Sequence, residues 1–174
     1  MIEAEHGPDS AALLVTHSRE LADKVVPIMN AQLEKLSDKR RSFIETNFTT
    51  YGGIILTNSL EESIDFVNDY APEHMEVMTK NPFDVLPLIK NAGEILLGDY
   101  TPVTLCNFVL GPNAILPTGG FAKTYSSVSV MDFLKRSSVG YASKEGFDKV
   151  RDHAYRFATV EGFETHALAV KERE

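Results

Sequence analysis

Short apolar runs alternate with amphipathic segments along the first hundred residues, and this alternation limits the fold more than any other feature. Four segments have the length and pattern of strands: the apolar runs 11–16, 54–57 and 94–97, and the segment 74–78, in which apolar and polar residues alternate. Four helical patterns lie between them: about 18–36, 39–48, 59–68 and 83–91. Strands and helices at this spacing predict an α/β fold: a parallel sheet with flanking helices, in an incomplete Rossmann-like arrangement.

Glycine and proline mark several expected breaks in this pattern. Pro27 is expected to kink or divide the first helix, and Gly93 is expected to close the last one as its C-cap. Glycines and prolines crowd into 100–125, which predicts a long irregular segment. Beyond it we expect a short helix at 130–135 and helices at 144–159 and 164–172. The chain is therefore divided into an α/β domain, 1–125, and a small helical C-terminal appendage, 126–174.

Composition excludes several classes of partner. The 174 residues are 43% hydrophobic, enough for a globular domain with a real core. A formal charge of −8 and the lack of a basic patch argue against nucleic acid as a partner. The apolar runs are too short to span a bilayer, and residues 1–10 lack the apolar region of a signal peptide. Cys106 is the single cysteine, so a reducing, cytoplasmic location is expected.

Glu73 and His74 lie between a predicted helix and a predicted strand. Pro72 cannot extend the helix and disfavours helical backbone at the residue before it, so the chain must turn there. A carboxylate beside an imidazole can perform general acid–base chemistry near neutral pH. Taken alone, an exposed Glu-His dipeptide in a turn is far more often solvated surface than a catalytic pair.

A second candidate pair lies near the start of the chain. Glu3 precedes His6 by three residues, so both side chains can reach one metal ion from a helical turn or a tight loop. Glu-x-x-His occurs often by chance, so this spacing carries little weight without its context.

Five motifs in order resemble those of the histidinol dehydrogenase family. They are Glu3 to Ser10, Tyr70 to Met75, Gly98 to Pro102, Asn113 to Thr118, and Thr165-His166. The resemblance covers essentially the whole chain but only the carboxyl-terminal part of the family, whose members carry another Rossmann-like half ahead of it. Since Met1-Ile2 runs almost directly into the first motif, we expect a fragment or a short gene that lacks its partner half.

The resemblance implies an activity and roles for several residues. The family uses zinc and NAD to oxidise an amino alcohol, L-histidinol, through its aldehyde to the carboxylate in histidine biosynthesis. Glu73 and His74 match its catalytic pair, in which the glutamate activates water for the second step and the histidine shuttles protons. Glu161 matches a substrate-binding carboxylate, with Glu164 as the weaker candidate for that role.

The implied zinc ligands are Glu3, His6, Asn107 and His166. His6 and His166 match the family, whereas Glu3 replaces the usual glutamine and Asn107 replaces the usual aspartate. The two exchanges compensate, because the set keeps two imidazoles, one carboxylate and one amide oxygen. Two alternatives stay open: manganese in place of zinc, or a Glu3 and an Asn107 that only form hydrogen bonds.

The serious departure is Ala114, which stands where the family has a substrate-binding histidine. The alanine side chain cannot form a hydrogen bond to a polar group of the substrate, so the identity of the alcohol that is oxidised stays open. The readings are a histidinol dehydrogenase-like oxidoreductase, a paralogue that oxidises a different hydroxy compound, and a non-catalytic metal-binding remnant.

The resemblance also implies partners. The dinucleotide is held mostly by the half that is absent here, so this chain alone is expected to bind NAD poorly or not at all. The family's tail crosses to the other subunit, which predicts a homodimer with a swapped tail; the alternative is a self-folded monomer.

Overall fold

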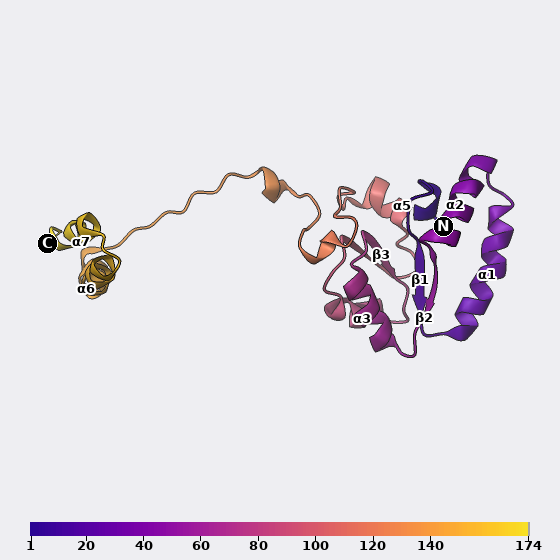
Figure 1. The fold of residues 1–174 in the computed structure, drawn as a ribbon, viewed down its shortest axis with the longest axis horizontal. Helices are drawn as coiled ribbons and strands as arrows, with labels where there is room; N and C mark the ends of the chain where they lie inside the picture. The colour runs from indigo at the N-terminus through magenta and orange to yellow at the C-terminus, as the bar shows by residue number, and fades with distance from the viewer. Residues whose placement is uncertain (174) are drawn as a thin grey trace. The chain divides into compact units, whose positions relative to one another are not determined.

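The computed structural model describes residues 1–173. The chain forms two compact units, Met1–Phe133 and a second that begins at Leu134. Figure 1 follows the chain by colour, and each unit is described by itself.

The first strand pair holds the amino-terminal third together. Strand β1 (Leu13–Thr16) pairs in parallel with β2 (Gly53–Leu56). Helices α1 (Arg19–Leu33) and α2 (Asp38–Thr50) connect the two strands and lie on one side of the pair in Figure 1, with α3 (Leu60–Tyr70) on the other. Ser18 caps α1, its Oγ accepting a hydrogen bond from the Leu21 N–H at 3.2 Å.

Pro27 lies inside α1 without dividing it. A proline removes one helical hydrogen bond and leaves the carbonyl four residues earlier, that of Asp23, without its helical donor. Both residues are exposed, so water can bond to that carbonyl. Of the two effects expected of Pro27, a kink or a division of the helix, the division is wrong for that reason.

The second strand pair carries the candidate catalytic residues. Helix α3 (Leu60–Tyr70) is capped by Ser59 and ends at Ala71, which adopts left-handed backbone with φ 52°. Strand β3 (His74–Val77) then pairs in parallel with β4 (Glu94–Leu97), and His74 lies opposite Glu94. The α/β class and the parallel pairing are confirmed. Among residues 1–173, however, the strands form two separate two-stranded sheets instead of one, and α3 packs against β1.

The two faces of the β3–β4 pair differ in chemistry. One face packs Val77 against Ile64 of α3 and Val85, with Met75, Ile95 and Leu97 partly buried around them. Side chains alternate along a strand, so the other face carries His74, Glu76, Glu94 and Leu96. A second small core lies there, made of Leu96, Val103 and Cys106. This acidic face, buried under the segment that follows β4, is where the candidate site lies.

The helix expected over 83–91 is mostly wrong. Helix α4 spans only Pro82–Val85, and a 3₁₀ turn, Leu86–Leu88, follows it. Pro87 lacks an N–H, and the side chain of Asn68 then bonds to the next backbone groups. Its amide donates to the Leu88 carbonyl at 2.9 Å, and its oxygen accepts from the Lys90 N–H at 2.6 Å.

Gly93 is not the C-cap of a helix but a point of close backbone approach. Its N–H donates to the Pro72 carbonyl at 2.9 Å. A Cβ there would lie 2.6 Å from the Glu73 carbonyl oxygen and 3.2 Å from Cδ of Pro117.

We therefore expect Gly93→Ala to destabilise the fold by about 1–3 kcal/mol, since backbone must move to admit the methyl group. Urea unfolding followed by circular dichroism measures this loss. Gly140→Ala is the matched control, because nothing lies within 4 Å of a Cβ at that position. Equal unfolding midpoints for the two variants would contradict the close approach.

The segment after β4 is more helical than expected. A turn of helix, α5 (Val103–Leu105), continues into a π-helical turn, Cys106–Leu110. The Glu76 carboxylate anchors its start by accepting a hydrogen bond from the Val103 N–H at 2.9 Å. A bend and a turn at 98–100 precede this helical stretch, and the part beyond Gly111 is largely irregular, with 3₁₀ turns at Phe121–Lys123 and Val130–Phe133.

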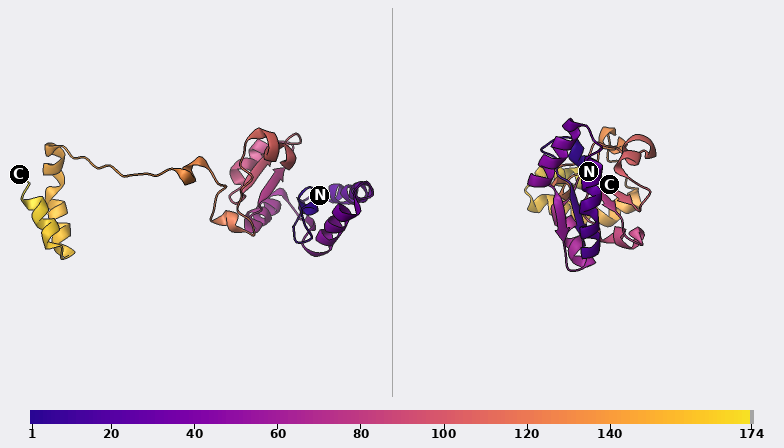
Figure 2. Two further views of the ribbon diagram at one scale, coloured as in Figure 1. Left: turned by 90° about the horizontal axis from the view of Figure 1, so that it is seen from above. Right: turned by 90° about the vertical axis from the view of Figure 1, so that its right-hand side faces the viewer.

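The second unit is a pair of helices, α6 (Lys144–Val160) and α7 (Glu164–Lys171), which pack side by side (Figure 2). Ser143 caps α6 by accepting a hydrogen bond from the Gly146 N–H at 3.1 Å. The hairpin leaves large apolar side chains exposed, among them Phe157 at 71% and Val160 at 85%. Of the helices in residues 1–173, none is long and apolar enough to cross a membrane.

Candidate active site

A buried imidazole lies between two carboxylates at the amino end of β3. The His74 side chain is 8% exposed, and its Nδ1 is 2.9 Å from Oε2 of Glu94. Its Nε2 is 3.7 Å from Oε1 of Glu73, whose side chain is 39% exposed. The structure thus confirms that Glu73 and His74 lie close together. The Nε2 atom of His74 faces the accessible carboxylate of Glu73, and its Nδ1 atom faces the buried carboxylate of Glu94.

The strand register brings these groups together. His74 and Glu94 are the first residues of two paired parallel strands, and opposed residues in such a pair project from the same face. Sites in open parallel sheets commonly form beyond the carboxyl ends of the strands. Here the acid–base groups lie at the amino ends of β3 and β4 instead.

The loop that contains Ala114 is anchored beside this site. Leu116 and Pro117 pack against Gly93, next to the Glu73 carbonyl. Farther along, Lys123 forms an ion pair with Asp69 of the α3 helix at 2.9 Å. Ala114 itself is exposed and offers no polar group.

The predicted metal ligands at the start of the chain form a pair. Glu3 lies in a 3₁₀ turn, Glu3–Glu5, that His6 caps. Nδ1 of His6 is 3.3 Å from Oε2 of Glu3. The other oxygen of Glu3, Oε1, is buried and has no hydrogen-bond partner among the residues that the structure describes.

Asn107 shows the same feature as Glu3. It lies in the π-helical turn beside Cys106, and its Oδ1 is buried without a hydrogen-bond partner in the described part of the chain. Buried polar atoms are nearly always bonded, so such atoms need an explanation. Coordination to a metal ion that accepts oxygen ligands would satisfy either atom, and the donor types suit zinc.

The predicted metal ligands are divided between the two units of the chain. In residues 1–173, no three His, Cys, Asp or Glu side chains are grouped as metal ligands. The predicted set has only two such residues in the first unit, Glu3 and His6. Asn107 contributes an amide, and His166 belongs to the second unit.

Cys106 is buried on the acidic face. Burial raises the pKa of its thiol, and the negative charges of Glu94 and Glu76 raise it further. Because the thiolate is the reactive form, we expect iodoacetamide to modify Cys106 at least about tenfold more slowly than an unhindered thiol at neutral pH. Mass spectrometry of the native and guanidinium-unfolded chain measures this; equal rates in the two states would contradict the burial.

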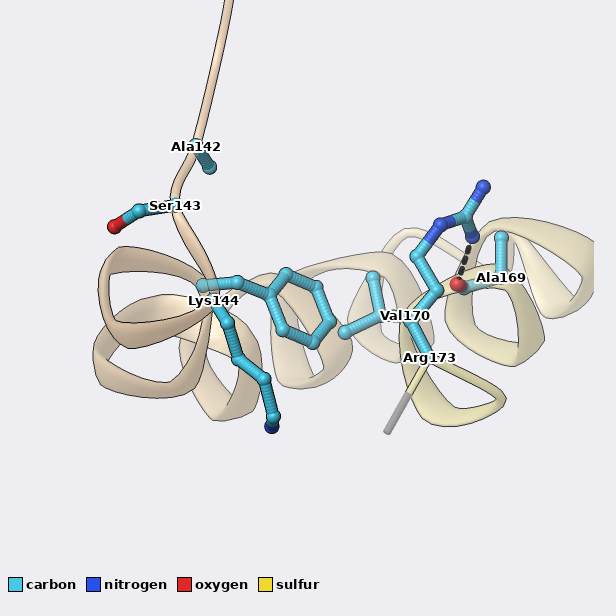
Figure 3. Close-up of a pocket in the computed structure, with 7 residues that line it drawn as sticks. Ala142, Ser143, Lys144, Ala169, Val170 and Arg173 are labelled. Atoms are coloured by element: carbon cyan, nitrogen blue, oxygen red, sulfur yellow. Dashed lines mark hydrogen bonds between the residues drawn. The ribbon is translucent and has the colours of Figure 1, made fainter.

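The other two predicted site residues come together in the second unit. Glu161 and His166 both line a hollow of about 770 Å³ together with Phe157 and Phe163. The His166 ring lies 5.1 Å from the Phe163 ring, centre to centre. A neighbouring hollow of about 520 Å³ is lined by Lys144, Val170 and Arg173, and there Arg173 donates to the Ala169 carbonyl (Figure 3).

Glu94 is the site residue that sequence reasoning misses. Its side chain is 5% exposed, and its Oε1 lacks a hydrogen-bond partner within residues 1–173. A signal was present, because the predicted strands at 74–78 and 94–97 start at His74 and Glu94. Pairing these strands in parallel from their first residues would have placed the two side chains together.

Comparison with known proteins gives one consistent result. The family model described as histidinol dehydrogenase matches residues 1–174. The chain is 55% identical over 174 residues to the histidinol dehydrogenase of Synechocystis sp. The match covers 100% of this chain and 40% of that protein. It is 51% identical over 173 residues to histidinol dehydrogenase homolog 2 of Mesorhizobium japonicum, covering 99% of this chain and 39% of that protein. It therefore spans about 40% of the length of these relatives.

A solved structure agrees with these relatives. The crystal structure of histidinol dehydrogenase from Elizabethkingia anophelis matches with a TM-score of 0.91 and 31% sequence identity, over 97% of this chain and 38% of that one. The family model spans the whole chain, and the sequence relatives cover nearly all of it. This chain belongs to the histidinol dehydrogenase family.

Proposed function

We propose that this chain carries the acid–base and metal-binding portion of a zinc- and NAD-dependent oxidoreductase that oxidises L-histidinol to the carboxylate in histidine biosynthesis. The observation that supports this most is the buried His74 imidazole between Glu94 and the accessible Glu73. We assign the metal and acid–base motifs to 1–125, the exchanged tail to 126–174, and the protein to the cytoplasm.

The proposed reaction has two oxidations with separate proton transfers. An alcohol, two NAD⁺ and one water give a carboxylate, two NADH and three protons. His74 takes the hydroxyl proton at Nε2 in the first step, and Glu73 takes a proton from the attacking water in the second. The exposure of the two side chains supports this division, since Glu73 is open to water and His74 is buried.

We propose that Glu3, His6 and Asn107 of one chain and His166 of a second chain hold the zinc ion. When bound, zinc would polarise the substrate oxygen as a Lewis acid. The unpaired, buried oxygens Oε1 of Glu3 and Oδ1 of Asn107 support these assignments. Nδ1 of His6 lies 3.3 Å from Oε2 of Glu3, so these two side chains would also orient each other in the absence of the ion.

The swapped tail is supported by the surface of the second unit. Phe157 and Val160 are exposed on α6, and the hollow lined by Phe157 also contains Glu161 and His166. Burial of this apolar surface against a second copy would deliver Glu161 to the substrate and His166 to the metal. A homodimer with exchanged tails is therefore proposed.

A hybrid enzyme tests the proposed function. Since the chain spans 40% of the Synechocystis relative, the hybrid replaces that matching portion and keeps the rest, which is expected to hold NAD. We expect the hybrid to restore growth without histidine to a bacterium that lacks histidinol dehydrogenase. The unmodified relative is the positive control, and the relative without its matching portion is the negative control.

Oxidation of a different hydroxy compound is the second candidate, and Ala114 favours it. This residue is exposed in the loop beside Glu73 and cannot bond to the substrate group that a histidine would bind. A hybrid that fails to restore growth, yet reduces NAD⁺ with another alcohol, would support this candidate. Ala114→His in the same hybrid should then shift preference toward L-histidinol.

A further inference from the structure

We propose that Glu94 is a positioning residue of this site: its buried carboxylate fixes the proton of His74 on Nδ1 and leaves Nε2 free as the base. This inference rests on the proposed function, because it assigns a role within the same acid–base machinery. The contact that carries it is the 2.9 Å hydrogen bond between Nδ1 of His74 and Oε2 of Glu94.

The tautomer follows from the chemistry of the partner. An ionised carboxylate can only accept hydrogen bonds, so the nitrogen that faces Glu94 must carry the proton. The other nitrogen, Nε2, then has a lone pair, and it is the one that faces Glu73 at 3.7 Å. A substrate hydroxyl would give its proton to Nε2, from which the proton can pass to Glu73 or to solvent.

Burial makes this arrangement more than a surface ion pair. The side chains of His74 and Glu94 are 8% and 5% exposed, so water screens their interaction weakly. While His74 holds two protons, the Glu94 carboxylate carries the balancing negative charge. Oε1 of Glu94 has no hydrogen-bond partner in residues 1–173, so no other described donor shares that charge.

The strand register holds His74 and Glu94 in a fixed position relative to each other. His74 and Glu94 are direct partners in the β3–β4 ladder, so their backbones are fixed relative to each other. The Glu94 N–H donates to the Glu73 carbonyl at 2.8 Å, which ties the three residues of the site into one unit. Groups held in this way by regular backbone need little reorganisation during reaction.

Nitrogen-15 NMR of the histidine-labelled chain tests this proposal without reference to activity. We expect the His74 Nδ1, assigned by its loss in His74→Gln, to be protonated in the wild type. In Glu94→Gln the side-chain amide can donate a hydrogen bond to Nδ1, so the imidazole proton is expected to move to Nε2. The same change of tautomer follows when the aspartate of a Ser-His-Asp catalytic triad is replaced by asparagine. Glu76→Gln, a change of the same type on the same face of β3, should leave Nδ1 protonated.

Activity in the hybrid enzyme supplies the second readout. We expect Glu94→Gln to lower kcat by about 10²- to 10⁴-fold. Glu94→Asp keeps the negative charge and should retain both the Nδ1 proton and part of the activity. It also covers the case in which the glutamine variant does not fold. Circular dichroism checks that each variant is folded.

The two proposals fail in different ways. An unprotonated Nδ1 in the wild type, or the same protonation of Nδ1 in Glu94→Gln, would overturn the role of Glu94 whatever the hybrid oxidises. A hybrid that oxidises no alcohol would overturn the proposed function, while the NMR result would still decide whether Glu94 sets the tautomer.

Discussion

Replacing Glu73 with glutamine is expected to slow aldehyde oxidation by about 10²- to 10⁴-fold while leaving alcohol oxidation nearly intact. Only the second step consumes a water. Of the two carboxylates that pair with His74 in residues 1–173, Glu73 is the accessible one, at 39% exposed against 5% for Glu94. Glutamine keeps the size of the side chain but cannot take a proton. Separate assays of the hybrid enzyme with L-histidinol and L-histidinal, following NADH formation, measure the two steps.

Glu61→Gln is the control for that change, because Glu61 is exposed on α3 ahead of the site. It should alter neither step. Equal losses in both steps for Glu73→Gln would show that the carboxylate does not act on water, and would leave it a role in orienting His74 alone.

Replacing His6 with alanine is expected to reduce bound zinc from about one ion per chain to almost none, because a structural or catalytic zinc site needs its full set of protein ligands. The fold should survive, since the His6 side chain is 60% exposed and its removal opens no cavity. Elemental analysis of the purified variant measures the zinc. A thermal melt of the zinc-free wild type and the variant compares their folds.

His17→Ala serves as the control for zinc, because His17 is also exposed but is not among the proposed ligands. Asn107→Leu should also lose the ion, since leucine offers no oxygen. Wild-type zinc content in His6→Ala would contradict the assignment of Glu3, His6 and Asn107 as one ligand group.

Most of the element pattern could be predicted because it rests on local chemistry. Ser18 and Ser59 stand at the starts of two predicted helices and are their N-caps in the structure, and the strands at 74–77 and 94–97 begin at the predicted residues. Pro72 sets the start of β3, and Ala71 takes the left-handed backbone that ends α3 before it. These signals act over a few residues, so a sequence displays them directly.

The failures arose from contacts between distant segments. The side chain of Asn68 forms hydrogen bonds with the backbone of Leu88, 20 residues away, and of Lys90. The amphipathic pattern of 83–91 therefore does not become one continuous helix. Glu76 caps Val103 from 27 residues away and helps a helical turn to form in a segment rich in glycine and proline. Local propensity carries no information about such partners.

In the candidate site, too, the residues in local motifs could be predicted, and the residue brought in by a long-range contact could not. Glu73, His74, Glu3 and His6 stand in short motifs, and the structure pairs each glutamate with its histidine. Glu94 has no motif of its own, because it enters the site through strand register alone. Register depends on how two strands meet in space, which the spacing along the chain does not specify.

The measurement that tests the central proposal most directly is the yield of NADH per molecule of L-histidinol consumed by the hybrid enzyme. We predict two NADH per alcohol, with the carboxylate as the final product identified by mass spectrometry. A folded hybrid that forms no NADH from L-histidinol, under conditions in which the unmodified Synechocystis relative forms two, would contradict the proposal that this chain completes a histidinol dehydrogenase.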